Sequence, residues 1–318
     1  MQYRYLGKSG LRISNLALGS WLTYGSKVDV GGTRSCIDAA LDAGVNFIDT
    51  ADVYSFGDAE KVLGRALEGR ARSHLVLATK CFFPMSDDPN DRGLSRKHMV
   101  ESADASLGRL RTDYIDLYQC HRFDERSPLA ELVHTIGLLM NRGKILYWGV
   151  SCWSAEQIRE VCRLCDSMGV PRPISNQPPY NLLERGIEES VVPASIEEGL
   201  GQVVFSPLAQ GMLTGKYEKG SIPEGSRASE ERDGVWLRPW MREEVFEAVD
   251  RVREVADELG TTLARLALAW CAHKPGIDSV VFGASSVRQV EENAAAAEVS
   301  LSDEAVERVE AAVGGVRL

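Results

Sequence analysis

Four side chains of complementary chemistry stand near the ends of separate apolar runs: Asp49, Tyr54, Lys80 and His121. A tyrosine phenol has a pKa of about 10 and is a poor acid at neutral pH. A neighbouring lysine ammonium stabilises the phenolate, so we expect Lys80 to lower the pKa of Tyr54. Asp49 can keep Lys80 charged and fixed, and His121 can donate a hydrogen bond that polarises a carbonyl oxygen. This set predicts carbonyl reduction, in which a bound cofactor supplies the hydride.

Each of these residues also has a purely structural explanation. A carboxylate after a strand can cap the next helix, a tyrosine can pack against a loop, and a lone histidine is often structural. Lys80 is more informative, because it follows the apolar run Leu75–Ala78 and ends it with an ammonium group. An acid, a lysine, a tyrosine and a histidine at neighbouring strand ends together favour a catalytic site.

Short apolar runs of strand length alternate with longer segments of helical periodicity along the whole chain. Several runs are apolar on consecutive residues, as expected for parallel strands that helices cover on both faces. This alternation favours a closed (β/α)8 TIM barrel, forming one domain over residues 1–318. An open sheet would carry a dinucleotide fingerprint after its first strand, and Leu16–Leu22 contains none. The predicted strands are Leu16–Gly19, Asn46–Asp49, Leu75–Lys80, Tyr114–Cys120, Ile145–Ser151, Ile174–Gln177, Gln202–Ser206 and Ser279–Phe282.

Barrel enzymes place their catalytic groups at the carboxyl ends of the strands, so the four side chains should meet at one mouth. The first 13 residues read as a β-hairpin before the first strand, which could plug the floor of the barrel. The long segment Ser206–Trp240 after strand seven predicts a loop that closes over a ligand. The predicted helices are Thr33–Ala43, Asp58–Leu67, Ser95–Leu110, Pro128–Asn141, Ser154–Met168 and Ile187–Glu198.

Two segments after the last strands could bind an anion, since phosphates often bind there in such barrels. Lys216 and Arg227 follow strand seven. After strand eight, Gly283–Ser286 open a helix whose first N–H groups would face an anion. Ser286 and Gln289 equally well form a simple capping box, so both interpretations stand. Gly211–Tyr217 resembles a phosphate-binding loop only superficially, because its spacing is one residue short and a tyrosine replaces the metal-binding hydroxyl.

Composition and charge exclude other classes of protein. The chain has 318 residues, 44% hydrophobic and 26% charged, with a net charge of −10, which disfavours a general nucleic-acid-binding surface. Its seven cysteines are scattered, which indicates a reducing compartment. Cys162 and Cys165 read as core residues of one helix rather than as a metal or redox pair. The N-terminus is too polar for a signal peptide, and no apolar run reaches 18 residues. We therefore expect a cytoplasmic protein without membrane insertion.

Several separated motifs, in order, carry a resemblance to a known family. They are Asp49-Thr-Ala-Asp-Val-Tyr54, Lys80, Leu107–Asp116 running into His121, and Gly283-Ala-Ser285 with Gln289 and Asn293. Over essentially its full length the sequence resembles the aldo-keto reductase superfamily. It is most similar to the branch that holds the β subunits of voltage-gated potassium channels and their bacterial relatives. Gly93–His98, Tyr147–Gly149, Ser206–Leu208, Gly215–Tyr217 and Ser226–Ser229 carry this closer similarity.

The resemblance implies that Asp49, Tyr54, Lys80 and His121 form a catalytic tetrad beside an extended NADP(H). It implies a nicotinamide stacked near Tyr180 or a neighbouring aromatic ring, with Ser151 and Gln177 on its carboxamide. Ser206, Pro207 and Leu208 would contact the pyrophosphate region, and Lys216, Arg227, Ser285 and Gln289 the 2′-phosphate and nearby groups. The implied cofactor residues are Ser20, Trp21, Asp49, Ser151, Cys152, Gln177, Phe205, Ser206, Pro207, Leu208, Lys216, Arg227, Gly283, Ser285, Gln289, Glu292 and Asn293. The expected substrate pocket is lined by Trp21, Tyr54, Phe82, Phe83, His121 and Trp153.

Three departures from the branch bear on function. The channel subunits carry an asparagine where this chain has His121, which favours a working reductase here. They also have a long N-terminal extension that this chain lacks, and where a tryptophan is common this chain has Phe82-Phe83. We therefore expect an NADPH-dependent reductase of aldehydes or activated ketones. A protein that senses NADP(H) for a partner, and a metal-dependent hydrolase, are the alternatives, but only His121 among five histidines is well placed for a metal. The branch also makes a homo-tetramer or octamer plausible.

Overall fold

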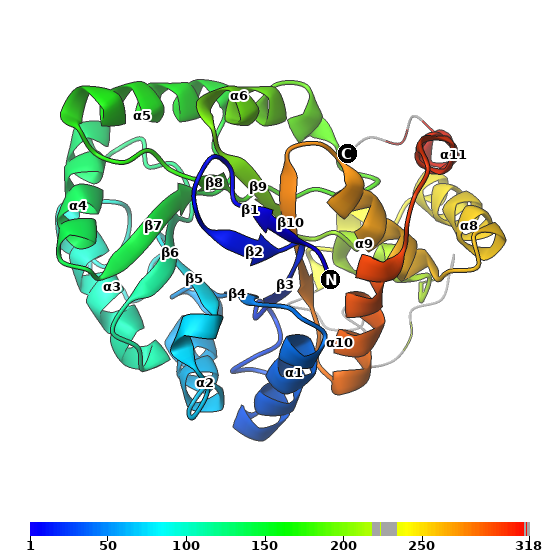
Figure 1. Ribbon diagram of the computed structural model, residues 1–318, viewed down its shortest axis with the longest axis horizontal. Helices are drawn as coiled ribbons and strands as arrows, with labels where there is room; N and C mark the ends of the chain where they lie inside the picture. The colour runs from blue at the N-terminus through cyan, green and yellow to red at the C-terminus, as the bar shows by residue number, and fades with distance from the viewer. Residues whose placement is uncertain (218–222, 224–233, 315, 317–318) are drawn as a thin grey trace.

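The computed structural model describes residues 1–217, 223, 234–314 and 316, and its centre is a closed barrel of parallel strands. β10 pairs with β3 and so closes the ring (Figure 1). All eight predicted strands are confirmed, with ends that differ by at most a few residues. The barrel strands are β3 (Leu16–Gly19), β4 (Phe47–Asp49), β5 (Val76–Cys81), β6 (Ile115–Cys120), β7 (Ile145–Val150), β8 (Ser175–Asn176), β9 (Gly201–Val204) and β10 (Ile277–Gly283).

Helices surround the barrel, and the local sequence sets where several of them begin and end. Ser154 caps α5 and exchanges hydrogen bonds with Gln157, as the capping-box pattern predicts. Gly169 then ends α5 with a φ of 65°, a conformation that costs glycine little. The helices are α1 (Val30–Asp42), α2 (Asp58–Ala66), α3 (Arg96–Leu110), α4 (Leu129–Asn141), α5 (Ala155–Met168), α6 (Val191–Glu198), α8 (Glu243–Glu258), α9 (Leu263–His273), α10 (Val287–Ala294) and α11 (Asp303–Val313).

Short 3-10 helices lie between these elements, and two of the α-helices stand apart from the barrel repeat. α8 and α11 pack against each other at one side of the molecule (Figure 1). The 3-10 segments are η1 (Tyr54–Gly57), η2 (Arg72–His74), η3 (Gly186–Glu188), η4 (Ala209–Thr214), η6 (Arg238–Trp240) and η7 (Ala295–Glu298). η1 and η4 follow strands β4 and β9, so they belong to the carboxyl-terminal mouth of the barrel.

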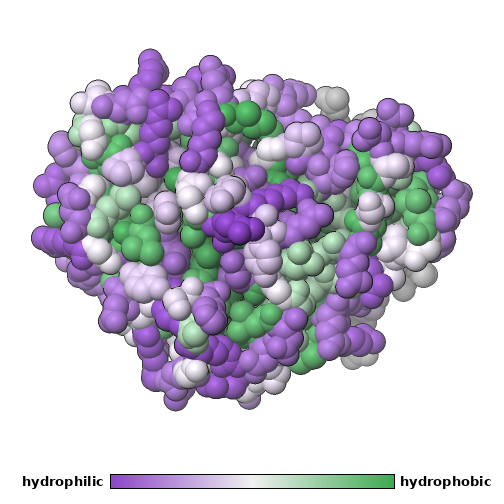
Figure 2. All heavy atoms as spheres, viewed as in Figure 1, coloured by the Kyte–Doolittle hydropathy of each residue, from purple (hydrophilic) through white to green (hydrophobic). Residues whose placement is uncertain are grey.

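The N-terminal hairpin, β1 (Tyr3–Tyr5) and β2 (Arg12–Ser14), closes the opposite end of the barrel. Its Leu6 and Ile13 are fully buried and join one apolar cluster with barrel residues such as Phe47. The Gly7 N–H donates to Asp278 Oδ2 at 2.7 Å, at the start of β10. Figure 1 shows the hairpin lying across the barrel end, and hydrophilic residues cover the middle of that face in Figure 2. The prediction of a floor plug is confirmed, and catalytic chemistry is left to the other end.

No helix in the described part of the chain is long and apolar enough to span a membrane.

Close packing of α2 on α3 gives a first testable prediction. An added Cβ at Gly64 would lie 2.9 Å from the Leu110 Cα and press into the Arg109 carbonyl oxygen. Gly64→Ala should therefore destabilise the protein by about 1–3 kcal/mol, because backbone must move. Gly108→Ala is the matched control, since an added Cβ there meets nothing within 4 Å on an exposed helix position. It should stabilise by up to about 1 kcal/mol. Urea unfolding measures both, and equal effects would contradict the packing argument.

Candidate active site

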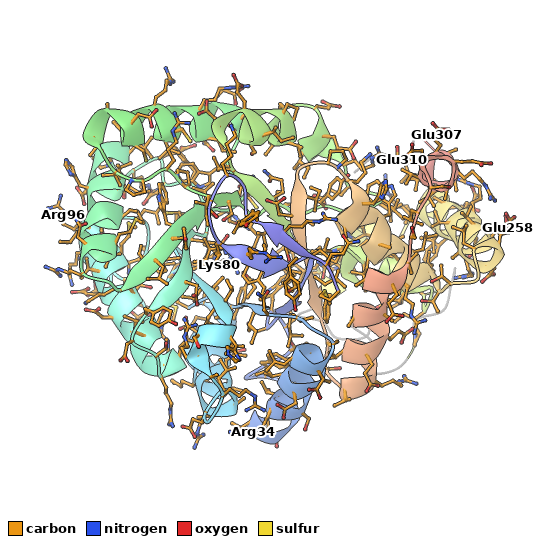
Figure 3. The ribbon with its side chains drawn as sticks, in the orientation of Figure 1. Arg34, Lys80, Arg96, Glu258, Glu307 and Glu310 are labelled. Carbon is orange, nitrogen blue, oxygen red and sulfur yellow. The ribbon has the colours of Figure 1, made fainter. Side chains whose placement is uncertain are left out.

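The structure brings the four sequence-predicted side chains together at the mouth. Lys80 lies within the barrel on β5 (Figure 3), Asp49 ends β4, and His121 follows β6. Lys80 Nζ donates to Asp49 Oδ2 at 2.6 Å and lies 3.3 Å from the Tyr54 hydroxyl oxygen. The Tyr54 and His121 rings meet edge to face, with their centroids 5.8 Å apart. A phenol, an ammonium and an imidazole therefore border one small volume.

Lys80 and Asp49 form a buried ion pair that is held from several sides. The Lys80 side chain is 0% exposed and the Asp49 side chain 4%. Lys80 Nζ also donates to the Thr50 carbonyl oxygen at 2.8 Å, and Gln177 Nε2 donates to Asp49 Oδ1 at 2.8 Å. Burial alone would lower the pKa of Lys80, but the negative charges of Asp49 and of ionised Tyr54 outweigh burial and raise it. The ammonium is therefore fully charged at neutral pH.

The pKa of Tyr54 departs from the sequence-based expectation. Burial raises it above its usual value, and the positive charge of Lys80 offsets only part of that rise. Lys80 therefore acts in the expected direction, but the net shift of the Tyr54 pKa is upward, because desolvation of the phenolate outweighs one nearby ammonium. Tyr54 stays protonated at neutral pH, which is the state that a proton donor needs.

His121 is neutral at physiological pH. Burial lowers its pKa well below the usual value, and the charges of Lys80 and Arg122 lower it further. Its Nδ1 is buried without a hydrogen-bond partner among the described residues. A neutral imidazole carries one N–H group, which can donate to a substrate oxygen.

A second buried network, which sequence reasoning missed, holds the segment that carries Tyr54. Ser55 and Phe56 take φ values of 50° and 51°, an unusual conformation for residues with a side chain. Behind this turn, the fully buried Glu60 accepts from Arg109 Nε at 2.6 Å and from Thr79 Oγ1 at 2.5 Å. Asp52 accepts from the Ser102 hydroxyl at 2.9 Å. Carboxylates in the Asp49–Glu60 stretch were the only sequence signal for this network.

Asp52 gives the protein a pH-dependent stability. Burial and the charge of Glu60 raise the pKa of Asp52 to about 7. A carboxyl whose pKa is higher in the folded state favours folding below its unfolded pKa of about 4 and loses this contribution as the pH rises toward 7. A difference of about three units corresponds to about 4 kcal/mol as an upper limit. Asp52→Asn should therefore gain stability relative to the unmodified protein between pH 5 and pH 8, measured by urea unfolding. Parallel stability curves would show that Asp52 is ionised throughout.

Arg122 is a second residue that sequence reasoning missed. Its Nη1 donates to the His121 carbonyl oxygen at 2.5 Å and lies 3.5 Å from Ser151 Oγ. Its guanidinium carbon lies 5.4 Å from the centroid of the Phe83 ring. The position of Arg122 directly after His121 was the only sequence signal for its role, because a sequence does not show where an arginine side chain points.

The residues expected around the nicotinamide lie at neighbouring strand ends. The Ser151 hydroxyl donates to the Gln177 carbonyl oxygen at 2.7 Å, so β7 and β8 are tied together there. Cys152 is half-buried and takes a φ of 57°. Ser20 is fully buried and donates to Thr50 Oγ1 at 2.8 Å. These side chains share the mouth with the ion pair, since Gln177 bonds both Ser151 and, through its amide, Asp49.

The segments after β9 and β10 carry the residues that we expect from the sequence to bind a phosphate-bearing cofactor. Ser206, Ala209 and Gln210 take left-handed φ values of 56°, 45° and 58°, and the Ala209 N–H donates to the Ser206 carbonyl oxygen at 3.0 Å within this tight turn. An added Cβ at Gly283 would meet nothing within 4 Å. The open space at Gly283 fits the close approach of an extended dinucleotide such as NADP(H). Pro207 is buried, Phe205 and Leu208 are half-buried, and Lys216 is exposed.

The sequence allowed either an anion site or a capping box at the start of α10, and the structure shows only half of the capping box. The Ser286 side chain caps the helix by accepting from the Gln289 N–H. The Gln289 Oε1, however, accepts from the Ser285 N–H at 2.8 Å, so the reciprocal half of a capping box is absent. Asn293 Nδ2 donates to the Gly283 carbonyl oxygen at 3.3 Å, and Arg265 Nε to the Glu292 carbonyl oxygen at 3.3 Å.

Two residues that we expected at the cofactor, Tyr180 and Arg227, are not seen at the mouth of the barrel in the described part of the chain. Tyr180 stacks on Trp270 with centroids 5.2 Å apart, and its hydroxyl donates to Glu188, so its ring and its hydroxyl both have partners within the protein. Phe205, the neighbouring aromatic ring, instead meets Trp21 at the mouth with centroids 6.4 Å apart. Arg227 and much of the predicted loop Ser206–Trp240 fall outside the described residues.

Aromatic rings line the mouth on the substrate side. Phe83 meets His121 edge to face at 4.9 Å between centroids, and Phe82 meets Phe83 at 5.3 Å. Trp236, which we did not predict, meets Trp21 at 5.7 Å. Trp153 is only 1% exposed and packs on Phe123 at 4.8 Å between centroids, so it offers almost no surface to a substrate.

Cys162 and Cys165 lie on the buried face of α5 and belong to the core, as the sequence predicted. Burial raises the pKa of each thiol to about 12, so neither is a nucleophile at neutral pH.

Comparison with known proteins decides the family. A family model described as the aldo/keto reductase family matches residues 15–313. The chain belongs to the aldo/keto reductase family. Membership accounts for the closed barrel and for the position of the tetrad at its carboxyl end. It confirms the resemblance that the separated motifs predicted.

Within this family the chain is similar to several proteins named as channel subunits. It is 43% identical over 302 residues to a probable voltage-gated potassium channel subunit beta of Arabidopsis thaliana, covering 94% of this chain and 92% of that protein. A protein of the same name from Oryza sativa subsp. japonica is 42% identical over 98% of this chain and 97% of its own length. A putative voltage-gated potassium channel subunit beta of Schizosaccharomyces pombe is 40% identical over 303 residues, which cover 93% of this chain and 88% of that protein. The predicted similarity to this branch of the family is confirmed.

Proposed function

We propose that this protein is an NADPH-dependent reductase that converts aldehydes or activated ketones to alcohols. The observation that carries the proposal is the position of the Tyr54 hydroxyl, 3.3 Å from the Lys80 ammonium and beside the His121 ring. A proton donor with a charged neighbour is what the alkoxide that forms during carbonyl reduction requires. The protein would act as one barrel domain on small carbonyl compounds in the cytoplasm.

NADP(H), when bound, supplies the hydride. Ser151 and Gln177 would hold the carboxamide, and Ser206, Pro207 and Leu208 the pyrophosphate. Lys216, Arg227, Ser285 and Gln289 would bind the 2′-phosphate side, with Glu292 and Asn293 at the adenine. The remaining contacts that we assign to the cofactor are Ser20, Trp21, Asp49, Cys152, Phe205 and Gly283.

The residues of the chain then handle the oxygen of the substrate. His121 donates a hydrogen bond that orients the carbonyl oxygen, and Tyr54 donates its proton to the same oxygen as negative charge develops there. Lys80 stabilises the phenolate that Tyr54 becomes, and Asp49 keeps Lys80 in place. Because Lys80 is charged and fixed before reaction, its field costs no reorganisation when the charge appears. Trp21, Phe82 and Phe83 border the substrate.

The names of the relatives raise a second candidate function. A channel-subunit-like protein could bind NADP(H) and report its redox state to a partner with little turnover. The full tetrad, including His121, favours turnover. NADPH oxidation followed at 340 nm with 4-nitrobenzaldehyde tests the first function directly. Binding of NADPH seen by fluorescence, with no oxidation across a panel of aldehydes, would favour the second.

Preference for NADPH over NADH should depend on Lys216. One charge-assisted hydrogen bond to the 2′-phosphate contributes about 1.5–3 kcal/mol, which is a roughly tenfold to hundredfold effect on affinity. Lys216→Ala should therefore weaken NADPH binding by that factor and leave NADH binding nearly unchanged, measured by fluorescence titration. Lys61→Ala, on the exposed face of α2, is a control that should change neither. Equal weakening of both cofactors would remove Lys216 from the 2′-phosphate site.

A further inference from the structure

We propose that Arg122 forms an anion-binding subsite at the mouth, and that the preferred substrates carry a carboxylate as well as the reacting carbonyl group. This inference rests on the proposed reductase function and narrows its substrate class to oxo acids, which include aldehydes with a carboxylate substituent.

The guanidinium lies between the catalytic histidine and the end of the next strand. Nη1 donates to the His121 carbonyl oxygen at 2.5 Å, and Ser151 Oγ at the end of β7 lies 3.5 Å away. The guanidinium also lies over Phe83, whose ring meets the His121 ring edge to face. Its positive charge acts on the active site, since it lowers the pKa of both Tyr54 and His121. An anion bound here would therefore sit beside the reacting carbonyl.

Arg122 has no carboxylate within ion-pair distance among the described residues. Some other half-buried arginines, such as Arg34 and Arg265, bond only backbone carbonyl oxygens. Arg72, Arg109 and Arg185 are also half-buried, and each holds a carboxylate within 2.9 Å or less. The acid nearest to Arg122 in sequence is Asp124. It faces elsewhere, accepting from the Leu94 N–H at 2.7 Å and from the Ser127 hydroxyl at 2.7 Å.

The free donors of Arg122 match a carboxylate. Arginine has five N–H donors in a planar fork, and only Nη1 is engaged in the described structure. The fork suits the two oxygens of a carboxylate, and such charge-assisted pairs are among the strong hydrogen bonds of proteins. Phe83 shields one face of the guanidinium from water, which strengthens the contact. Phe82 and Phe83 would meanwhile pack on the carbon skeleton of the same substrate.

Matched substrates test this subsite in the intact protein with NADPH. We would compare 2-, 3- and 4-formylbenzoate with their methyl esters, which keep the ring and aldehyde and lose the charge. Arg122→Gln should raise the KM for at least one carboxylate roughly tenfold to hundredfold, as expected for one charge-assisted contact. It should change kcat/KM for the esters less than about threefold. Arg122→Lys keeps the charge without the fork and should retain part of the preference.

Controls separate this role from two others. Arg126→Gln removes an exposed arginine of the same loop and should change neither class of substrate. Equal losses on carboxylates and esters in Arg122→Gln would mean that Arg122 only supports the His121 backbone, and the inference would be overturned. A weaker affinity for NADPH in Arg122→Gln, with an unchanged carboxylate preference, would assign the side chain to the cofactor and overturn it equally.

A binding measurement distinguishes failure of this inference from failure of the proposed function. If the unmodified protein reduces the aldehyde group of neither the formylbenzoates nor their methyl esters, the proposed reductase function is contradicted. Calorimetry with 4-(hydroxymethyl)benzoate and its methyl ester, in the presence of NADP⁺, still reports on the subsite. Tighter binding of the carboxylate that is lost in Arg122→Gln supports it, and equal binding of both compounds contradicts it.

Discussion

Tyr54→Phe should abolish most of the reductase activity while leaving the cofactor bound. Proton donation by a positioned side chain contributes roughly a hundredfold to ten-thousandfold, so the turnover number should fall by that factor. The phenol is half-buried, its pKa is raised by burial, and Lys80 Nζ lies 3.3 Å from its oxygen. No other described hydroxyl bonds Lys80 Nζ. NADPH oxidation at 340 nm with 4-nitrobenzaldehyde measures the effect.

The same chemical change on the floor of the barrel provides the control. Tyr5 is 60% exposed on the hairpin, so Tyr5→Phe should leave turnover and stability unchanged. The affinity for NADPH, measured by fluorescence, should be similar in both variants, because the assigned phosphate contacts lie after β9 and β10. If Tyr54→Phe turned over as fast as the unmodified protein, the proposed mechanism would be contradicted. Loss of NADPH affinity in Tyr54→Phe would instead indicate a binding role for the phenol.

Lys80→Met should lower both turnover and stability. The variant leaves the Asp49 carboxylate buried, with only the Gln177 and Gln119 amides at 2.8 and 3.4 Å as donors. Removing one partner of a buried ion pair typically costs about 3–5 kcal/mol, because the other charge stays uncompensated. The phenolate of Tyr54 also loses its stabilising charge, so turnover should fall at least as far as in Tyr54→Phe. Urea unfolding and the 340 nm assay measure the two losses separately.

A double variant separates the two effects in Lys80→Met. Asp49→Asn combined with Lys80→Met removes both charges, and an asparagine can still accept from Gln177. This variant should recover most of the lost stability, since a neutral pair of similar size is tolerated where a lone charge is not. It should stay inactive, because the ammonium beside Tyr54 is absent. Recovery of activity with stability would show that Lys80 acts only by holding the fold.

The barrel and the meeting of the four side chains at its mouth could be predicted because they depend on local patterns. Apolar runs such as Val76–Ala78 and helical periodicity fix which segments are strands and helices, and parallel strands bring their carboxyl ends together. The glycines and caps that end the helices are also local, as at Gly169. The types and order of Asp49, Lys80 and His121 at those ends were therefore enough to favour the reaction that we propose.

The tertiary structure decided what depends on burial and on contacts between distant segments. The net direction of the Tyr54 pKa shift differs from the sequence-based expectation, because the cost of burying a phenolate cannot be read from neighbours alone. The buried pair of Glu60 and Arg109 joins residues 49 positions apart. Tyr180 faces Trp270 rather than the mouth, and Arg122 turns between two strand ends with no carboxylate beside it in the described chain. Sequence periodicity sets which residues share a face, but packing sets which of them meet and how dry their surroundings are.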